Sequence, residues 1–497
     1  MNSARPSVIV IGAGFGGLGV AHRLLRDGYG DVTVLERAAD VGGVWRDNTY
    51  PNAACDVPSS LYSWSFAKKH DWTHRYARQP EILDYIRATA AESGLRDRVR
   101  TGAQVTAADW DQAAQRWRVH LATGETLESD VLVPAVGQLS RPAVPRIPGL
   151  QTFAGPQFHS ATWDHDVDLR GRRVGVIGTG ASAIQFVPGI VDEAGSLTVF
   201  QRSAPYVVPK TDRTYAEWEK RLFVRFPRIH DVARAGVFHL SEQLNKTLDA
   251  DGRLAAALKR IWRLHLSHQV RHPQLRAKLV PDYPLGCKRL LFSNDWYPAL
   301  TRDHVDVVTD RIAAVEPAGV RTADGILHEL DVLILGTGFA ATEFLGPIRV
   351  TGRDGLDLHE DSWDDGARAH LGITVPGFPN LFLVYGPNTN LGGSSIIGML
   401  EAQAGYIAQV VRAVAGGGPL EVRQDVADAY DGEMQERLAD SVWSSCASWY
   451  REPGGRVTTN WPGPVAEYQR RTARLEPADF AVATVGAGQS PGALRPS

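Results

Sequence analysis

A glycine-rich turn close to the start of the chain constrains its fold more than any other sequence feature. Residues 8–11 form a short apolar run that leads directly into the turn. The turn contains Gly12, Gly14 and Gly17 in the spacing GxGxxG, and a helical segment follows it. In such a turn the first glycine makes the tight bend, the second lets backbone approach a pyrophosphate, and the third lets helix and strand pack closely. We therefore predict a βαβ dinucleotide-binding unit over residues 7–36.

The same pattern recurs in the middle of the chain. An apolar run at 173–177 leads into a turn of the form GxGxxA, whose members are Gly178, Gly180 and Ala183. A helical segment and another apolar run follow, as they do in the first unit. The sequence therefore predicts an α/β fold with two Rossmann-like dinucleotide-binding domains. In each, the helix N-terminus would offer free N–H groups and a partial positive charge to phosphates.

The residue that ends the second strand differs in charge between the two units. Counted from the first glycine of each turn, Glu36 lies at 36 − 12 = 24 and Arg202 at 202 − 178 = 24. A carboxylate binds ribose hydroxyls but repels a 2′-phosphate, so the first unit is expected to bind FAD. A guanidinium attracts that phosphate through charge-assisted hydrogen bonds, so the second unit is expected to bind NADPH, with Ser203 as a further contact.

Composition excludes several other function classes. The chain has 497 residues and a net charge of −3, without the basic bias of nucleic-acid-binding proteins. No apolar run reaches the ~18 residues that span a bilayer, and glycines interrupt the stretch 8–20, so we expect neither a membrane span nor a signal peptide. Three cysteines are too few and too scattered for a disulfide framework or a cysteine-built metal site. A cytoplasmic location is the simplest expectation.

One histidine pattern resembles a metal site without completing it. His265, His268 and His272 would share one face of a helix. However, no acidic partner or HExxH pattern accompanies them, so a polar face or a packing role is favoured. We predict no metal site, and none of these patterns bears on the oligomeric state.

Breaks in the pattern divide the chain into segments. A cluster of prolines marks a linker between the two units, and the segment after the second unit is rich in Arg, Leu, Ala and His at helical spacing. The predicted organisation is an FAD-binding domain in two parts (1–144 and 370–475), an NADP-binding domain in two parts (145–211 and 285–369), a helical insertion in the NADP-binding domain (212–284) and a mobile tail (476–497).

A third motif lies between the two glycine turns. Its members are Phe153, Gly155, His159, Trp163 and Asp164, in the spacing FxGxxxHxxxWD. With this motif the chain resembles the type I Baeyer–Villiger monooxygenases, class B flavoprotein monooxygenases with the fingerprint FxGxxxHxxxW(P/D). Related monooxygenases that oxidise nitrogen or sulfur usually carry Tyr or Phe at the tryptophan position. In the resembling family this motif lies at the hinge between the domains, so His159 is expected to couple domain motion to catalysis.

Further short matches extend the resemblance over about residues 7–400. They are GGVW at 42–45, YPNAACD at 50–56 and GTGF at 336–339, with Asn52 as a departure where the family commonly has Gly. The resemblance implies that NADPH reduces FAD and that O2 then forms a C4a-peroxyflavin, which converts a ketone to an ester or lactone. The small-molecule partners are accordingly a ketone and O2, with no nucleic acid or membrane partner.

This chemistry needs a fixed positive charge, because the peroxide must stay deprotonated to attack a carbonyl carbon. Arginine is suitable because it remains protonated and donates from a planar fork. Arg289 matches the arginine of the family and is expected to stabilise the peroxyflavin and the Criegee intermediate. A buried arginine needs a partner, and Asp56 matches the acidic residue of the family at that position. Lys288 is expected to bind the 2′-phosphate of NADPH.

Other residues match cofactor contacts of the family. Trp45 and Tyr62 are expected near the flavin ring, and Val105 near the adenine. The remaining FAD contacts expected are Val44, Arg46 and Asp47. The NADPH contacts expected around the second turn are Gly178, Thr179, Gly180, Ala181, Ser182, Ala183 and Gln185.

Two alternatives stay open for a chain that binds both nucleotides. Reduction of a disulfide is not one of them, because it would need two cysteines beside the flavin, whereas Cys55 and Cys287 are far apart in the sequence. A flavin monooxygenase acting on amines or sulfides would share both turns without needing the Asp56–Arg289 pair. A non-catalytic redox sensor would keep the turns without that arginine. The substrate pocket is expected to be lined by the insertion, the loop 386–400 and the segment 443–461.

Overall fold

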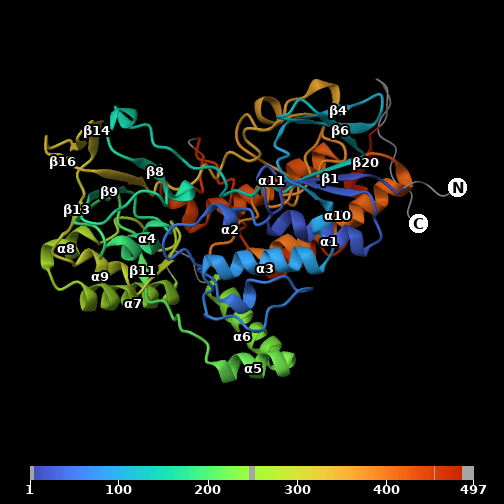
Figure 1. Cartoon of the computed structure of the whole chain (residues 1–497). Helices are drawn as coiled ribbons and strands as arrows, with labels where there is room; N and C mark the ends of the chain where they lie inside the picture. Colours follow the sequence, from blue (N-terminus) through green and yellow to red (C-terminus); the bar gives the residue numbers. More distant parts are fainter. Residues whose placement is uncertain (1–4, 246–251, 453, 484–497) are drawn as a thin grey trace.

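The computed structural model describes residues 5–245, 252–452 and 454–483. Figure 1 shows two α/β units side by side, with a helical hairpin that projects below them. The two units contain the two glycine turns, and we call them the FAD-binding and NADP-binding units after the nucleotides that the sequence predicts for them.

The first unit is built on a parallel sheet. Its strand order is β3-β2-β1-β7, with β1 (Val8–Ile11), β2 (Val32–Leu35), β3 (Val99–Arg100) and β7 (Val131–Pro134). The strands β1 and β7 are buried along their whole length, which explains why their sequences are continuous apolar runs. Helix α1 (Phe15–Arg26) packs against α10 (Ile396–Gly417), so the C-terminal part of the chain completes the core of this unit.

The second unit repeats this architecture. Its parallel sheet has the order β13-β10-β9-β17-β8. The strands are β8 (Gln157–His159), β9 (Arg173–Ile177), β10 (Ser196–Phe200), β13 (Val305–Val308) and β17 (Val332–Leu335), and helix α4 (Ala183–Ile190) follows β9. Because both sheets are parallel and both carry a glycine turn after the central strand, the α/β prediction with two Rossmann-like units is confirmed.

Smaller sheets and helices flank the two units. The antiparallel meander contains β4 (Val105–Asp111), β5 (Arg116–Leu121) and β6 (Thr126–Ser129), with β18 (Arg349–Thr351) beside β4. The NADP-binding unit carries β14 (Ile312–Glu316), β15 (Gly319–Thr322) and β16 (Leu327–Glu329), and the short pair β11 (Val207–Val208) and β12 (Leu291–Phe292). The other α-helices outside the insertion are α2 (Val44–Asp47), α3 (Gln79–Glu92), α9 (Trp296–Leu300), α11 (Gln424–Ala439) and α12 (Val465–Arg471). The short turns of helix are η1 (Ser59–Leu61), η2 (Arg96–Arg98), η3 (Leu150–Thr152), η4 (Ser160–Thr162), η5 (Arg353–Gly355), η6 (Leu358–Ser362), η7 (Val442–Ser445) and η8 (Pro477–Asp479).

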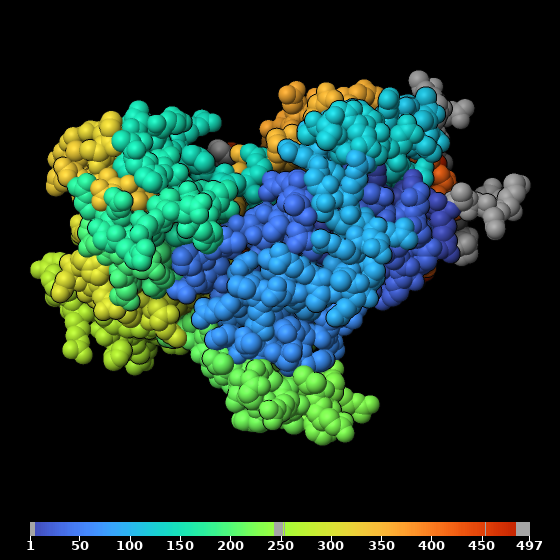
Figure 2. Space-filling view, in the orientation of Figure 1, coloured from blue at the N-terminus to red at the C-terminus, as the bar shows by residue number. Residues whose placement is uncertain are grey.

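The insertion is helical, as the sequence predicts. Its helices are α5 (Glu217–Arg225), α6 (Pro227–Asn245), α7 (Arg253–Gln269) and α8 (Pro273–Lys278). The hairpin of α5 and α6 forms the green projection in Figure 2, next to the FAD-binding unit. Arg234 of α6 donates to the carbonyl oxygen of Ser60 at 2.7 Å, and Lys68 pairs with Asp231 at 2.7 Å. The insertion therefore connects the two units. Among the described residues, no helix is both long and apolar enough to cross a membrane.

The C-terminal region differs from the expected mobile tail. The strand β20 (Phe480–Val482) pairs antiparallel with β19 (Leu420–Val422). Phe480 and Ala481 are buried there, so this part of the predicted tail is held by a sheet and by apolar packing. The rest of the predicted tail, residues 484–497, lies outside the described residues.

A disulfide between Cys287 and Cys446 is a second difference from expectation. The two cysteines are 159 residues apart in the sequence, and their Cα atoms lie 6.1 Å apart, within the usual range for a disulfide. Only the return of the C-terminal region to the boundary between the units brings them together. The third cysteine, Cys55, is buried and free.

Candidate active site

The first glycine turn is shaped to admit a phosphate. Gly12 has a φ of +104°, a conformation that favours glycine. A Cβ atom on Gly17 would lie 1.9 Å from the carbonyl oxygen of Gly12, so helix α1 approaches the turn more closely than any side chain allows. A Cβ atom on Gly14 would have no protein atom nearer than 3.7 Å. The backbone at Gly14 is thus open to a ligand at the N-terminus of α1.

Glu36 lies buried at the end of β2, where a ribose would be bound. Its Oε2 accepts from the N–H of Ala13 at 2.9 Å, and its Oε1 accepts from the N–H of Ala38 at 3.0 Å. Arg46 approaches the same Oε1 at 3.0 Å and pairs with Asp47 at 2.8 Å. Three of the predicted FAD contacts therefore form one polar network, which fixes the orientation of the Glu36 carboxylate.

Two aromatic side chains predicted near the flavin ring contact each other. Trp45 in α2 donates from Nε1 to the hydroxyl oxygen of Tyr62 at 3.1 Å, and the two rings meet edge to face with centroids 5.5 Å apart. Burial, followed by the neighbouring Cys55, raises the pKa of Tyr62 well above its usual value, so its hydroxyl stays protonated. Val44 begins the same short helix. Val105 is buried at the start of β4.

The second glycine turn has the same shape. Gly178 has a φ of +111°, and a Cβ atom there would lie 2.3 Å from the carbonyl oxygen of Gly336. A Cβ atom on Gly180 would have no protein atom within 4 Å, so this turn is also open to a ligand. Thr179 donates from its hydroxyl to the carbonyl oxygen of Ser203 at 3.1 Å, which ties the turn to the end of β10. Ala181 and Ser182 lie between this turn and α4, which begins at Ala183.

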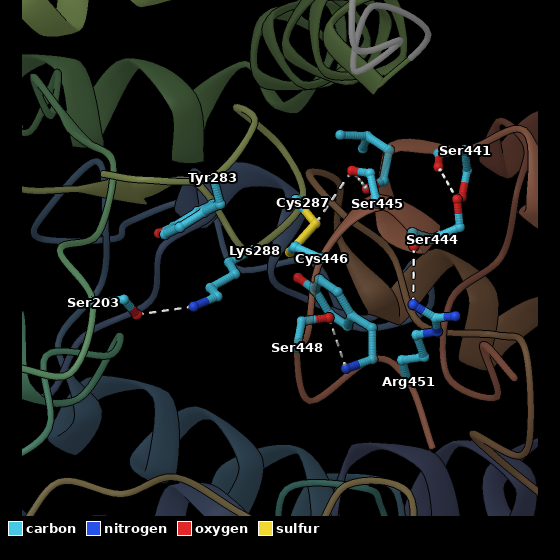
Figure 3. Close-up of a disulfide and its surroundings, with 12 residues drawn as sticks. Ser203, Tyr283, Cys287, Lys288, Ser441, Ser444, Ser445, Cys446, Ser448 and Arg451 are labelled. Carbon is cyan, nitrogen blue, oxygen red and sulfur yellow. Dashed lines mark hydrogen bonds between the residues drawn. A yellow bond between two sulfur atoms is a disulfide. The ribbon is translucent and has the colours of Figure 1, made fainter. Parts of the chain in front are cut away.

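Two cations, Lys288 and Arg202, lie beside that turn. Lys288 donates from Nζ to the hydroxyl of Ser203 at 2.9 Å and lies over the ring of Tyr283 at 4.4 Å, as Figure 3 shows. Burial and then the charge of Arg202 lower the pKa of Lys288. Within the described part of the chain, neither Lys288 nor Arg202 forms an ion pair, although the more distant charge of Asp282 favours the protonated form of Lys288. Two neighbouring cations of this kind fit an anionic group such as the 2′-phosphate of NADPH.

Arg289 and Asp56 form an ion pair that joins the two units. The Nη2 and Nε atoms of Arg289 lie 2.6 Å and 2.9 Å from Oδ2 of Asp56. The charge of Asp56 raises the pKa of Arg289 above its usual value, so the guanidinium stays protonated. The Arg289 side chain keeps 24% of its surface accessible and the Asp56 side chain 34%. A cofactor or substrate can therefore still reach the pair.

Gln185 lies between the units rather than at the open turn. Its Oε1 accepts from the hydroxyl of Tyr50 and from the N–H of Ala54, both at 3.2 Å. Its Nε2 donates to the carbonyl oxygen of Ala54 at 3.0 Å. Gln185 thus holds α4 against the loop that carries Asp56. This is a positioning contact that the resemblance did not indicate.

Three further polar residues surround the ion pair, and the sequence analysis did not single them out. Tyr385 donates from its hydroxyl to Asn390 at 2.7 Å, and Lys210 donates to the carbonyl oxygen of Cys55 at 3.4 Å. Tyr450 is fully buried, and its hydroxyl has no hydrogen-bond partner among the described residues. Burial raises the pKa of Tyr450 to about 12, although the nearby charge of Arg289 opposes the shift. Only Tyr450 falls in a segment that was expected to line the pocket.

The fingerprint motif, residues 153–164, contains β8, the strand of the second sheet that comes first in the sequence. His159 ends β8, is buried, and accepts at Nδ1 from the N–H of Ala161 at 3.0 Å. Burial lowers the pKa of His159. Trp163 packs against Phe158 and Phe186, with ring centroids 5.1 Å and 5.3 Å apart. The motif is therefore part of the packing of the second unit and does not reach the Asp56–Arg289 pair directly.

The three histidines of the insertion are not assembled as a metal site. The Nε2 atom of His265 lies 3.1 Å from the carbonyl oxygen of Ser293, a contact between α7 and the segment after β12. Among the described residues, no group of His, Cys, Asp and Glu side chains is arranged to hold a metal ion.

A family model, a protein relative and solved structures all indicate the same kind of protein. Residues 6–225 match the family described as pyridine nucleotide-disulphide oxidoreductase. A protein of Streptomyces coelicolor named Baeyer–Villiger monooxygenase is 43% identical to this chain, over 96% of this chain and 92% of its own length.

Solved structures of monooxygenases are also similar to this chain over nearly its whole length. Cyclohexanone monooxygenase from Rhodococcus sp. Phi1 bound to NADP+ is 29% identical, with a TM-score of 0.85 over 94% of this chain and 96% of its own. The OTEMO complex with FAD and NADP is 28% identical, with a TM-score of 0.86 over 97% of this chain and 100% of its own.

Fold and site together define the class of protein. Two open glycine turns, one beside a buried carboxylate and one beside two cations, have the features expected of a flavoprotein oxidoreductase that binds FAD and NADP. More particularly, the chain belongs to the Baeyer–Villiger monooxygenases. It is an FAD-dependent monooxygenase that uses NADPH and O2 to convert a ketone to an ester or lactone.

Proposed function

We propose that Arg289 is the catalytic cation of this reaction and that Asp56 positions it. The observation that carries this proposal is the ion pair across the two units, with 2.6 Å between Nη2 and Oδ2. FAD, when bound and reduced, supplies the chemistry that activates O2. Negative charge develops during oxygen transfer to a carbonyl, and a guanidinium that stays protonated and is already oriented stabilises it. Asp56 accepts from two Arg289 nitrogens and thereby restricts the rotation of the guanidinium.

We also propose that Arg202, Lys288 and Ser203 bind the 2′-phosphate of NADPH. Burial, and then the charge of Arg202, lower the pKa of Lys288, and an anion bound beside both cations would favour its protonated form. A coenzyme whose ribose lacks this phosphate would gain no binding energy from having two cations at this position. The other predicted contacts of the two cofactors remain part of this proposal, except Gln185, whose side chain is bound to the loop that carries Asp56.

The expected domain boundaries and the role of His159 remain part of this proposal. The linker at 141–149 separates β7 of the first unit from β8 of the second, in agreement with a boundary near 145. His159 ends β8, which is the edge strand of the second sheet and pairs with β17. A change in the angle between the units would be transmitted through this strand. We further propose a cytoplasmic location.

A panel of ketones and sulfides tests the proposed function. NADPH consumption, product mass and hydrogen peroxide release would be measured for the FAD-loaded protein with cyclic, linear and aryl ketones and with an aryl sulfide. We expect ester or lactone products whose formation equals NADPH consumption for at least one class of ketone. If sulfoxide were formed efficiently and no ketone gave an ester, the role assigned to the Asp56–Arg289 pair would be wrong.

A further inference from the structure

The Cys287–Cys446 bond connects the catalytic arginine to the C-terminal region. Cys287 lies two residues before Arg289, and Cys446 lies four residues before Tyr450. Figure 3 shows the bond beside Lys288, between the segment of the NADP-binding unit on one side and the serine-rich turn on the other. Cys287 is fully buried, whereas Cys446 is only partly buried. Cys446 is therefore the more accessible of the two cysteines.

The serine-rich turn, residues 441–450, makes its other polar contacts locally. Ser444 donates to the carbonyl oxygen of Ser441 at 2.8 Å, and Arg451 donates to the carbonyl oxygen of Ser444 at 3.0 Å. Among the described residues, its one hydrogen bond to the NADP-binding unit is from the hydroxyl of Ser445 to Sγ of Cys287 at 3.6 Å. Sulfur is a weak acceptor, so this contact contributes little. Apart from packing, the disulfide is therefore the main attachment of this turn to the segment that carries Arg289.

We propose that Cys287 and Cys446 form a reversible thiol–disulfide site that fastens the serine-rich turn over the catalytic arginine. In the disulfide state the turn is held closed, and Tyr450 stays buried beside Arg289. In the dithiol state the turn is attached only by packing and by the weak hydrogen bond from Ser445 to Cys287. It then opens more often, which exposes the arginine to water. The redox chemistry is independent of the proposed function, but its consequence for catalysis rests on the role proposed for Arg289.

The chemistry balances with a hydroperoxide as oxidant. The thiolate of Cys446 attacks one oxygen of hydrogen peroxide, which gives a sulfenic acid and releases hydroxide that becomes water. The thiolate of Cys287 then attacks that sulfur, the S–S bond forms and the S–O bond breaks, and a second water leaves. Two thiols and one hydrogen peroxide thus give one disulfide and two waters. A low-molecular-weight thiol reverses the step by attacking Cys446, with Cys287 as the leaving group, and a second thiol molecule completes the reduction.

The first test counts titratable thiols in the FAD-loaded protein, denatured after each treatment. After mild hydrogen peroxide we expect one thiol, that of Cys55, and after full reduction all three cysteines of the chain. The variant Cys446→Ser should give two thiols after either treatment. The control Ala447→Ser adds a hydroxyl at an exposed neighbour in the same turn and should behave as the unmodified protein. Three thiols after peroxide treatment would overturn the proposal.

The second test measures the opening of the turn by limited trypsin cleavage at Arg451. We expect cleavage to be faster in the reduced protein and in Cys446→Ser than in the oxidised protein, by about tenfold, which corresponds to roughly 1.4 kcal/mol in the opening equilibrium. Equal cleavage rates in the oxidised and reduced protein would show that the bond does not fasten the turn. Neither readout depends on ketone oxidation, so failure of this proposal and failure of the proposed function are distinguishable.

Discussion

At the scale of single residues, the proposed function depends on two arrangements of charged side chains. Arg289 is paired with Asp56, whereas Lys288 senses the charge of Arg202 and, among the described residues, has no ion pair with a carboxylate. The first arrangement keeps a cation oriented for a charge that appears during reaction. The second arrangement suits a ligand group that is always negatively charged, such as a phosphate. The two sites therefore respond differently to substitution.

Replacing Arg289 should separate coenzyme oxidation from product formation. Arg289→Ala is expected to lower ester formation ~10²–10³-fold, because one preorganised partner of the developing anion is lost. Arg289→Lys should fail nearly as badly, since an ammonium lacks the planar fork that Asp56 holds. NADPH oxidation should continue and release hydrogen peroxide. Product mass, NADPH consumption and peroxide are measured together, and near-normal ester formation by Arg289→Ala would contradict the assignment.

Replacing Arg202 should change coenzyme preference. Arg202→Ala is expected to raise the KM for NADPH by roughly 10- to 100-fold, the effect of losing a charged hydrogen bond of about 1.5–3 kcal/mol. The KM for NADH should change little, because NADH has no 2′-phosphate. Steady-state kinetics with both coenzymes check this. Equal losses with the two coenzymes would mean that Arg202 contacts another part of the nucleotide.

At the scale of elements, the strand–turn–helix junctions decide what binds. In the first turn Gly17 is required by helix packing, whereas Gly14 leaves space in the protein itself. The same distinction holds in the second turn between Gly178, which meets backbone, and Gly180, which meets nothing. Each turn therefore combines one glycine that the fold needs with one that only the ligand needs.

This distinction predicts different consequences for Gly14→Ala and Gly17→Ala. Gly17→Ala places a methyl group 1.9 Å from a backbone oxygen, so we expect a lower melting temperature and a poor yield of folded protein. Gly14→Ala should fold normally but bind FAD at least about tenfold more weakly, because the methyl group occupies the space of the pyrophosphate. Thermal unfolding of the apoprotein and FAD titration measure the two effects. Unchanged FAD affinity in Gly14→Ala would argue against a cofactor at this turn.

At the scale of the whole molecule, the site exists only where separate parts of the chain meet. Asp56 comes from the first unit and Arg289 from the second, and Gln185 fastens the two near that point. The hairpin of the insertion contacts the first unit through α6. His230 of α6 is buried there against His70, with ring centroids 4.7 Å apart.

The docking of α6 should weaken in mild acid. Burial, and then the neighbouring His70 and Arg234, lower the pKa of His230 from 6.5 to about 4. The unfolded state therefore binds more protons than the folded state between these values, so stability falls as the pH drops through this window, by at most roughly 1.4 kcal/mol per pH unit. Above pH 6.5 the contribution is fully present.

The variant His230→Gln removes this titration and tests it. We expect its melting temperature to fall less than that of the unmodified protein between pH 7.5 and pH 5. The control His239→Gln changes an exposed histidine of the same helix and should follow the unmodified protein. The same pH dependence in all three proteins would show that His230 does not control the docking.

The sequence by itself determined the two nucleotide-binding units, because a glycine turn between an apolar run and a helix is a local pattern. The difference between Glu36 and Arg202 is local in the same sense, and it indicated which nucleotide each unit binds. Asp56 and Arg289 were named only through the resemblance, since 233 residues separate them. Only the tertiary structure decided the contact of Gln185 with the Asp56 loop, the burial of Tyr450 beside Arg289, the pairing of β20 and the Cys287–Cys446 bond. These contacts join segments that are distant in sequence and meet only in the folded chain, either within a unit or where the two units pack together, and no local pattern specifies such a meeting.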